Sequence, residues 1–116
     1  MKKGKFYSRF RHRGIDFKNE VEGYKIDSYC FMYKNKYNLW MMVDIKSGLC
    51  VCTGETQKEC INYYNDSYKQ KTLDYLTNNA KWYDHMCEEF ETLPVHTYEE
   101  IDAMDIKEES KDYEDL

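Results

Sequence analysis

Three short hydrophobic segments joined by two short loops constrain the fold of this chain more than any other feature. The segments cover residues 24–33, 39–44 and 49–53, and the loops between them read KNKYN and IKSG. A parallel connection needs about a dozen residues or more, so loops this short allow only antiparallel pairing. We therefore predict a three-stranded antiparallel meander. The continuous apolar run at the end of the first segment predicts burial on both faces, and Gly48 suits a positive φ angle in the second turn.

The sequence after the third segment predicts a helix. Thr56 and Glu59 have the spacing of a capping box, in which each side chain binds a free backbone N–H group at the start of a helix. Apolar and aromatic side chains then recur every three or four residues to about Thr77, which indicates an amphipathic helix. The predicted buried stripe of this helix consists of Ile61, Tyr64, Tyr68, Thr72, Tyr75 and Leu76.

Two further helices are predicted downstream. A second apolar stripe ends before Pro94, and the residue before a proline disfavours the helical conformation. The members of this stripe are Trp82, Tyr83, Met86, Cys87 and Phe90. Thr97 and Glu100 repeat the capping-box spacing and open a short third helix, which contributes Ile101 and Met104 to the core.

Together these elements define an α+β fold: a three- or four-stranded antiparallel sheet packed with two helices, a short third helix and an acidic C-terminal tail. The length of 116 residues fits one domain, because single domains typically have about 100–150 residues. We assign residues 1–14 to a basic arm or edge strand, residues 15–106 to a single α+β domain and residues 107–116 to the acidic tail. The tail has too few apolar residues to form part of a core.

Charge is distributed unevenly along the chain, whose net charge is −5. Residues 1–13 contain six Lys or Arg and no acid, whereas residues 99–116 contain nine acids and two Lys. If the basic arm is extended, successive side chains point to opposite faces, so one face is cationic and the other contains Phe6 and Phe10. The candidate nucleic-acid-binding residues on the cationic face are Lys3, Lys5, Tyr7, Arg9, Arg11 and Arg13.

Three interpretations of this arm stay open. The arm can be a solvated terminus or an edge strand whose cations oppose aggregation. It can contact nucleic acid, with its cations on phosphates and Tyr7 stacked on a base. It can also contact an acidic partner or the acidic tail of its own chain.

Signatures of catalysis, metal binding and membrane insertion are missing from the sequence. It contains no GxSxG, HExxH, P-loop or GxGxxG motif, so we expect no enzyme activity. Cys50 and Cys52 lie one residue apart in a predicted strand, so their side chains share a face. Zinc sites usually have their cysteine pairs on turns, so we expect buried free thiols and neither metal nor cofactor. No apolar run exceeds five residues and no leader-like segment follows the basic start, so we expect a cytoplasmic protein without a membrane span.

Most acids of the helical region are expected on solvated faces. Adjacent pairs such as Glu88 and Glu89 diverge on a helix and do not converge on a substrate. The acids nearest the predicted hairpins are Asp44, Glu55 and Glu59, which can line a cleft. One functional hypothesis is therefore a small enzyme that uses these three central acids. We rank it third, below the two non-catalytic binding hypotheses described at the end of this section.

Residues 29–64, about a third of the chain, run from strand to strand to strand and then through the sequence G-E-T-Q-K-E-C into a helix. In outline this segment resembles the small three-stranded DNA-binding modules of phage integrases and AP2-type proteins. The resemblance implies DNA binding through the exposed face of the sheet. Those modules have cations on that face, whereas this segment offers mainly Leu, Trp, Met, Val and Cys.

The leading hypothesis is a non-catalytic binding protein. Richness in Tyr, Asn and Lys with a single Pro is typical of an AT-rich genome, as in phages of low-GC bacteria, whose small proteins often inhibit host defences. We therefore expect a phage or mobile-element inhibitor of the anti-CRISPR or anti-restriction type, which places acids in the cationic nucleic-acid channel of a host protein. The candidate partner-binding residues are Glu99, Glu100, Asp102, Asp105, Glu108, Glu109, Asp112, Glu114 and Asp115. The alternative is a small nucleic-acid-binding module that uses the basic arm and the sheet.

Overall fold

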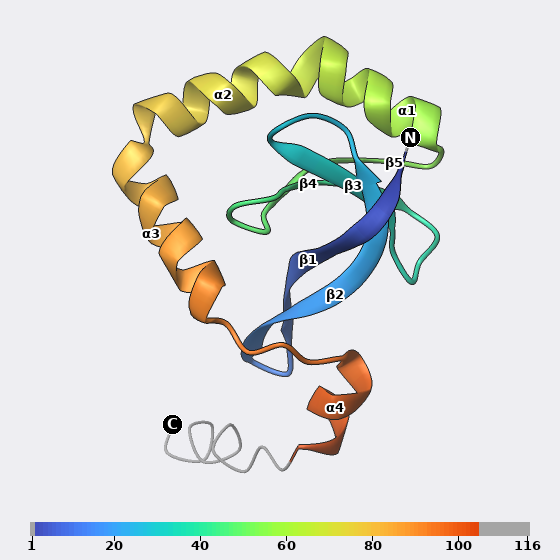
Figure 1. Cartoon of the computed structure of the whole chain (residues 1–116), viewed down its shortest axis with the longest axis vertical. Helices are drawn as coiled ribbons and strands as arrows, with labels where there is room; N and C mark the ends of the chain where they lie inside the picture. The colour runs from blue at the N-terminus through green and yellow to red at the C-terminus, as the bar shows by residue number, and fades with distance from the viewer. Residues whose placement is uncertain (1, 105–116) are drawn as a thin grey trace, which may run out of the picture.

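The computed structural model describes residues 2–104, in which a five-stranded antiparallel sheet is followed by helices that arch around it (Figure 1). The strands are β1 (Lys3–His12), β2 (Ile15–Lys25), β3 (Cys30–Lys34), β4 (Trp40–Asp44) and β5 (Cys50–Gly54). The helices are α1 (Gln57–Tyr63), a π-helical turn η1 (Tyr64–Tyr68), α2 (Lys69–Asn78), α3 (Ala80–Thr92) and α4 (Tyr98–Ala103). Strand order follows the chain from β1 to β5, which confirms the predicted α+β class and its antiparallel meander. None of the helices in this part of the chain is both long and apolar enough to cross a membrane.

The strands beyond the predicted meander come from a long hairpin, so the sheet exceeds the three or four strands expected. β1 pairs with β2 along its whole length, from Lys3 opposite Tyr24 to His12 opposite Ile15. A two-residue turn joins the two strands, and its residues Arg13 and Gly14 have φ angles of 54° and 79°. Two consecutive residues with positive φ are typical of the tight turns whose twist matches that of a hairpin. The basic arm is therefore the edge strand of the sheet.

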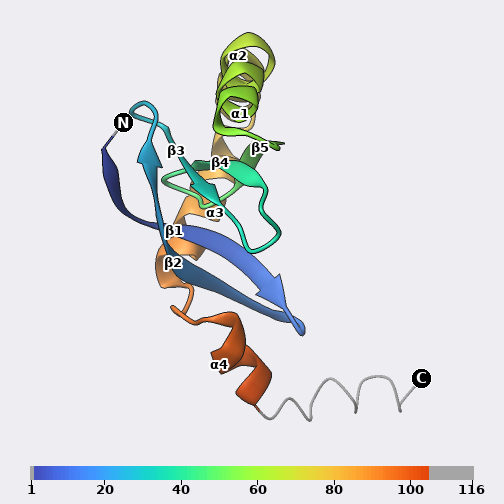
Figure 2. The ribbon, with the colours of Figure 1, turned by 90° about the vertical axis from the view of Figure 1, so that its right-hand side faces the viewer.

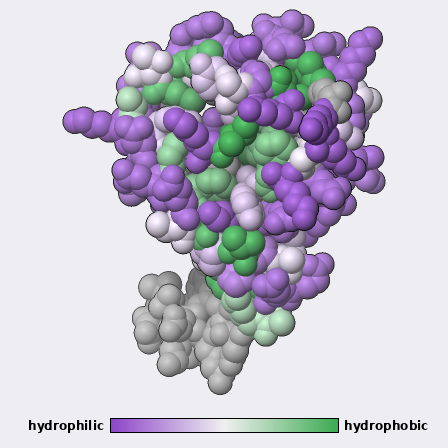
Figure 3. Space-filling view, in the orientation of Figure 1, coloured by the Kyte–Doolittle hydropathy of each residue, from purple (hydrophilic) through white to green (hydrophobic). Residues whose placement is uncertain are grey.

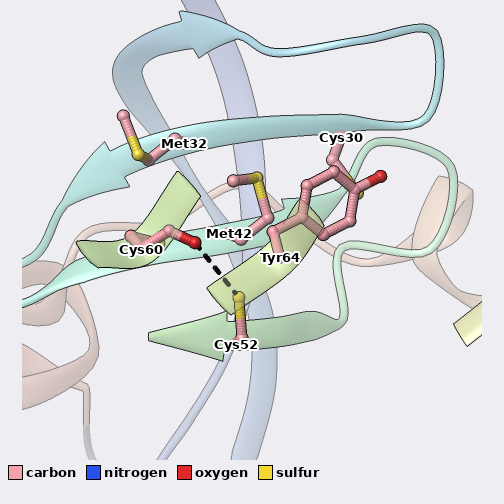
Figure 4. Packing of buried hydrophobic residues seen from close by; sticks show 6 residues of the cluster. All are labelled: Cys30, Met32, Met42, Cys52, Cys60 and Tyr64. Carbon is pink, nitrogen blue, oxygen red and sulfur yellow. Dashed lines mark hydrogen bonds between the residues drawn. The ribbon is translucent and has the colours of Figure 1, made fainter. Parts of the chain in front are cut away.

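β3 is buried on both faces, as the continuous apolar run predicted. Four consecutive residues of this strand are buried, and they alternate between two cores. The first core lies between the sheet and α1 with η1, and Figure 4 shows its buried members: Cys30, Met32, Met42, Cys52, Cys60 and Tyr64. The second core lies on the other face, where Phe31, Tyr33 and Val43 contact partly buried residues of the hairpin. The ring of Phe6 stacks on that of Phe31 with 4.5 Å between centroids.

The helices begin and end close to the predicted residues, but fewer of their side chains are buried against the sheet than predicted. Thr56 Oγ1 accepts a hydrogen bond from the Glu59 N–H group at 3.0 Å, and Thr97 caps α4 in the same way. The strands β3 to β5 have five residues each and are about 17 Å long, whereas α1 to α2 covers 22 residues or about 33 Å. The helices therefore extend past the sheet. Of the predicted tyrosine stripe Tyr64 is buried, whereas Tyr68 and Tyr75 are exposed.

The segment that follows α3 returns to the hairpin and positions α4 there. Lys18 in β2 exchanges backbone hydrogen bonds with Pro94 and His96, at 2.9 and 3.0 Å. α4 then lies beside the tip of the hairpin, which Figure 2 shows from the side. Ile101 is fully buried, and the ring of Tyr98 meets the ring of Phe10 edge-on at 5.3 Å. The predicted third helix is thus a packed part of the fold.

Candidate binding site

The cations of the basic arm mostly have partners within the chain. Three of them face acids across the hairpin: Lys3–Glu22 at 3.5 Å, Lys5–Glu20 at 3.4 Å and Arg11–Asp16 at 3.7 Å. All six of these side chains are largely exposed, and such surface pairs contribute about 0–1 kcal/mol. Their main effect is to neutralise the outer face of the hairpin. Tyr7 is 41% exposed, and the Lys18 ammonium group lies 5.5 Å from the centre of its ring.

Arg9 differs from the other cations because it is nearly buried. Its side chain is 14% exposed and donates to Glu89 Oε1 at 2.6 Å, to the Met86 carbonyl at 2.8 Å and to the Ser47 carbonyl at 3.1 Å. The guanidinium group also lies 5.5 Å from the ring centre of Phe90. These contacts join β1 to α3 and to the turn before β5. Arg9 is a structural residue in this arrangement, and each of its three guanidinium nitrogens donates a hydrogen bond within the chain.

The tip of the basic arm meets the acidic helix α4. His12 Nε2 lies 2.7 Å from Asp102 Oδ1, and Arg13 donates to the backbone carbonyl of Asp102 at 2.9 Å. His96 Nδ1 lies 3.0 Å from Glu100 Oε2, a hydrogen bond that lowers the pKa of the Glu100 carboxyl group. The contact joins the basic start of the chain to its acidic C-terminal part.

The candidate partner-binding acids fall into two groups. Glu99, Glu100 and Asp102 lie on α4 and are exposed. The remaining candidates lie outside the described residues: Asp105, Glu108, Glu109, Asp112, Glu114 and Asp115.

A further set of acids on α3 was missed by sequence analysis. Asp84, Glu88 and Glu91 are exposed and spaced four and three residues apart, which places them on one face of the helix. We call them the acidic stripe. Within residues 2–104, none of them lies within 4.0 Å of a cationic nitrogen. Glu89 points elsewhere, toward Arg9, so the adjacent pair Glu88 and Glu89 diverges as expected. The spacing alone could have shown the stripe.

Four large aromatic side chains are exposed along the helices from α1 to α3. The exposed fractions are 46% for Tyr63, 43% for Tyr68, 54% for Tyr75 and 43% for Trp82. Tyr75 at the end of α2 and Trp82 at the start of α3 meet edge-on, with 5.8 Å between ring centroids. Exposed Tyr and Trp side chains are enriched at protein interfaces, because they combine a large apolar surface with a polar group.

Two adjoining clefts lie where α2 leaves the sheet. The first has a volume of about 370 Å³ and is lined by β5, α2 and the start of α3; the second has a volume of about 670 Å³ and is lined by the turns before β3 and after β4 and by α2. Three residues line both: Asp44, Leu76 and Tyr83. We call the pair the arch clefts. Figure 3 shows several hydrophobic patches, some within the curve of the helices and some on the helices themselves, interspersed with hydrophilic residues.

A buried carboxylate forms part of the wall shared by the arch clefts. Asp44 is 6% exposed, and its Oδ2 accepts hydrogen bonds from Ser47 N at 3.0 Å, Ser47 Oγ at 2.6 Å and Tyr83 Oη at 2.8 Å. Burial, together with the hydrogen bond to Asp44, raises the pKa of Tyr83, so its hydroxyl stays a donor. Of the three central acids, Asp44 lines these clefts, whereas Glu55 and Glu59 do not. The structure therefore does not bring the three acids together in one cleft.

Three of the five cysteines are buried and contribute to packing, whereas Cys50 is exposed, so the prediction of a buried thiol is wrong for Cys50. Cys30, Cys52 and Cys60 are buried in the first core, and burial raises the pKa of both Cys30 and Cys52 to about 12, so these thiols are protonated at neutral pH. An irregularity in the pairing of β4 with β5 separates Cys50 from this group, and Cys50 lines the first arch cleft. Across residues 2–104, no three His, Cys, Asp or Glu side chains are placed to hold a metal ion.

The arrangement as a whole is suited to binding through charge and aromatic contact. The acidic stripe lies on α3, the exposed aromatic residues are spread from α1 to α3, and the arch clefts lie between α2, the start of α3 and the sheet. No protein-family model, no curated protein and no solved structure matches this chain.

Proposed function

We propose that this chain is a non-catalytic inhibitor, encoded by a phage or another mobile element, that binds a host protein with a cationic nucleic-acid channel. A CRISPR effector or a restriction complex fits this description, and the site of action is then the host cytoplasm. The acids and exposed aromatic rings of the helices enter the channel in place of nucleic acid. The basic hairpin does not take part directly and holds the fold together.

The observation that supports this proposal is the separation of charge between the two halves of the molecule. Residues 1–54, which form the sheet, contain eleven Lys or Arg and five acids, whereas residues 55–104, which form the helices, contain four Lys and eleven acids. The cations Lys3, Lys5, Arg9 and Arg11 are paired with acids of the chain, whereas the acidic stripe faces solvent. The acidic stripe is thus free for a partner, whereas four of the eleven cations of the sheet half are already paired with acids.

Chemistry favours a cationic channel as the binding partner. A channel that holds nucleic acid is lined with Lys and Arg, and complementary charge accelerates association with it. Nucleic acid offers a channel both negative charge and flat rings for stacking. Exposed Tyr and Trp side chains beside Asp and Glu offer the same two features. Richness in Tyr, Asn and Lys with a single Pro, which is typical of proteins from AT-rich genomes, adds support for a phage origin.

The first test is capture of a partner from a bacterial lysate, with and without nuclease treatment. An inhibitor is expected to retain a basic protein after nuclease treatment and to show no binding to duplex or single-stranded nucleic acid at low salt. Binding to nucleic acid alone would favour the alternative, a nucleic-acid-binding module. Its affinity would then fall with salt with a log–log slope of about −0.9 per phosphate contacted on duplex DNA.

Reversing the acidic stripe is expected to slow association with the captured protein. The variant Asp84→Lys, Glu88→Lys, Glu91→Lys should lower the association rate constant about tenfold at low salt, with a smaller effect at high salt, because surface charge acts through steering. Stopped-flow or surface-based kinetics at two salt concentrations measures this. The matched control is Asp16→Lys, Glu20→Lys, Glu22→Lys, which makes the same change in net charge on β2. Equal slowing by both variants would show that net charge, and not the stripe, governs the encounter.

A further inference from the structure

The wall shared by the arch clefts contains the Asp44 carboxylate, which forms no ion pair with any cation of residues 2–104. We infer that the arch clefts are a binding site for an arginine side chain of a partner protein, with Asp44 as the group that accepts the guanidinium. The inference rests on the proposed function for the source of the arginine, since nucleic-acid channels are rich in this residue. The site itself belongs to the isolated chain and can be tested without the partner.

The position of the Asp44 carboxylate is the first argument. All three hydrogen bonds that it accepts end on Oδ2, which leaves Oδ1 without a donor from residues 2–104. No buried side-chain oxygen in that part of the chain lacks a partner, so Oδ1 reaches the accessible wall of a cleft. The bonds from Ser47 and Tyr83 hold the carboxylate in place before a ligand arrives. A fixed acceptor binds a charged donor with little loss of conformational freedom.

The charge of Asp44 is uncompensated as well as buried. Within residues 2–104 no Lys, Arg or His nitrogen lies within 4.0 Å of its oxygens. A buried charge is costly unless it is paired. A cation that enters a cleft therefore forms a charge-assisted hydrogen bond with Oδ1. The neutral donors of Ser47 and Tyr83 already bind Oδ2.

The remaining walls match the rest of an arginine side chain. Tyr75, Trp82 and Tyr83 line the first arch cleft together with Leu49 and Val51. Aromatic faces attract a guanidinium group through cation–π contact and stacking, and apolar walls cover its three methylene groups. Arginine suits such a site better than lysine, because its guanidinium is planar and more weakly hydrated than an ammonium group.

Two lysines lie at the clefts and must be considered. Lys71 lines the first cleft and Lys46 lines the second, and both are exposed. Their charges are solvated and screened by salt, whereas that of Asp44 is buried and screened much less. The two lysines weaken the attraction for an incoming cation, but neither ammonium group lies within 4.0 Å of the Asp44 carboxylate.

The experiment compares a charged probe with its neutral isostere. Blocked arginine, Nα-acetyl-arginine methylamide, is titrated into ¹⁵N-labelled full-length protein, and the equivalent citrulline compound serves as the control. The arginine probe is expected to shift the Trp82 indole and Ser47 amide signals in a saturable way, with about tenfold higher affinity than the citrulline probe. Equal responses to the two probes, or no response to either, would overturn the inference.

Variants locate the site. Asp44→Asn keeps the shape of the side chain and an acceptor for its three donors, and it should reduce arginine binding to the citrulline level. Trp82→Ala tests the aromatic wall without touching the bonds of Asp44, so the inference stays testable if Asp44→Asn folds poorly. Glu88→Gln removes a charge that lines neither cleft and should leave binding unchanged. Binding that appears only in Lys46→Ala or Lys71→Ala would mean that the chain's own lysine fills the site, which contradicts the inference.

This experiment and the capture experiment can fail separately. Binding of the arginine probe without a captured partner would leave the site standing and reject the proposed inhibitor function. Capture of a basic protein without probe binding would keep the function and reject the arginine site.

Discussion

Replacing Arg9 with alanine is expected to lower the free energy of unfolding by about 3 kcal/mol, because a nearly buried charged donor loses its hydrogen bonds. The change removes the bonds to Glu89, Met86 and Ser47 and leaves two carbonyl groups and a carboxylate without their donor. Urea denaturation followed by far-UV circular dichroism measures the effect. Arg9→Lys should recover part of the loss, because an ammonium group can reach one acceptor but cannot reproduce the fork of a guanidinium.

Arg11→Ala is the matched control for this prediction. Arg11 has the same charge and lies on the same strand, but its side chain is 73% exposed and its nearest acid, Asp16, is 3.7 Å away. Its removal should change stability by less than about 0.5 kcal/mol. Similar losses for the two variants would contradict the structural role of Arg9. A large loss confined to Arg9 would also show that the basic arm is used mainly within the fold.

Gly48→Ala is expected to destabilise the protein by about 3 kcal/mol through two separate penalties. The φ angle of Gly48 is 70°, a conformation that costs a residue with a Cβ atom about 1–2 kcal/mol. The new Cβ atom would also lie 2.6 Å from Cζ of Phe90, closer than atoms can approach. Phe90 is buried, so its ring has little free space in which to move away from the new atom. Thermal or urea unfolding measures the loss.

Gly14→Ala separates the two penalties. Gly14 has a φ angle of 79°, but it is exposed in the turn of the hairpin. This variant should therefore lose only the conformational part, about 1 kcal/mol. If Gly14→Ala proves as damaging as Gly48→Ala, the contact with Phe90 contributes nothing. The difference between the two variants reports how tightly α3 is packed on the sheet.

Both positions hold α3 in place against the sheet. Arg9 binds this helix through Glu89 and the Met86 carbonyl, and Gly48 makes room for Phe90 from the same helix. α3 contains the acidic stripe and contributes Trp82 and Tyr83 to the first arch cleft. The stabilising contacts thus lie on one face of α3, which Trp82 and Tyr83 share, and the acidic stripe lies on the opposite face. Stripe variants should change association and leave stability nearly unchanged, whereas Arg9 and Gly48 variants should do the reverse.

Much of the fold could be predicted because it depends on near neighbours in the chain. Loop lengths decided the antiparallel meander, and the Thr56 and Thr97 caps decided where α1 and α4 begin. The positive φ angle of Gly48 followed from a short turn, and the burial of β3 on both faces followed from its continuous apolar run. The prediction of one strand over residues 24–33 was wrong, because β2 ends at Lys25 and β3 begins only at Cys30. β2 itself was missed, although Ile15, Phe17 and Val21 alternate with polar residues there.

The use of each charge and aromatic ring was decided by tertiary structure alone. The sequence shows Arg9 as one of six similar cations, and only the packing of a helix eighty residues away makes it structural. Likewise Tyr64 is buried whereas Tyr68 and Tyr75 are exposed, because α1 to α2 is longer than the strands and extends past the sheet. Asp44 meets Tyr83 across thirty-nine residues. Backbone periodicity and capping act within about four residues, whereas burial and charge pairing depend on which surfaces meet, and no local pattern encodes that.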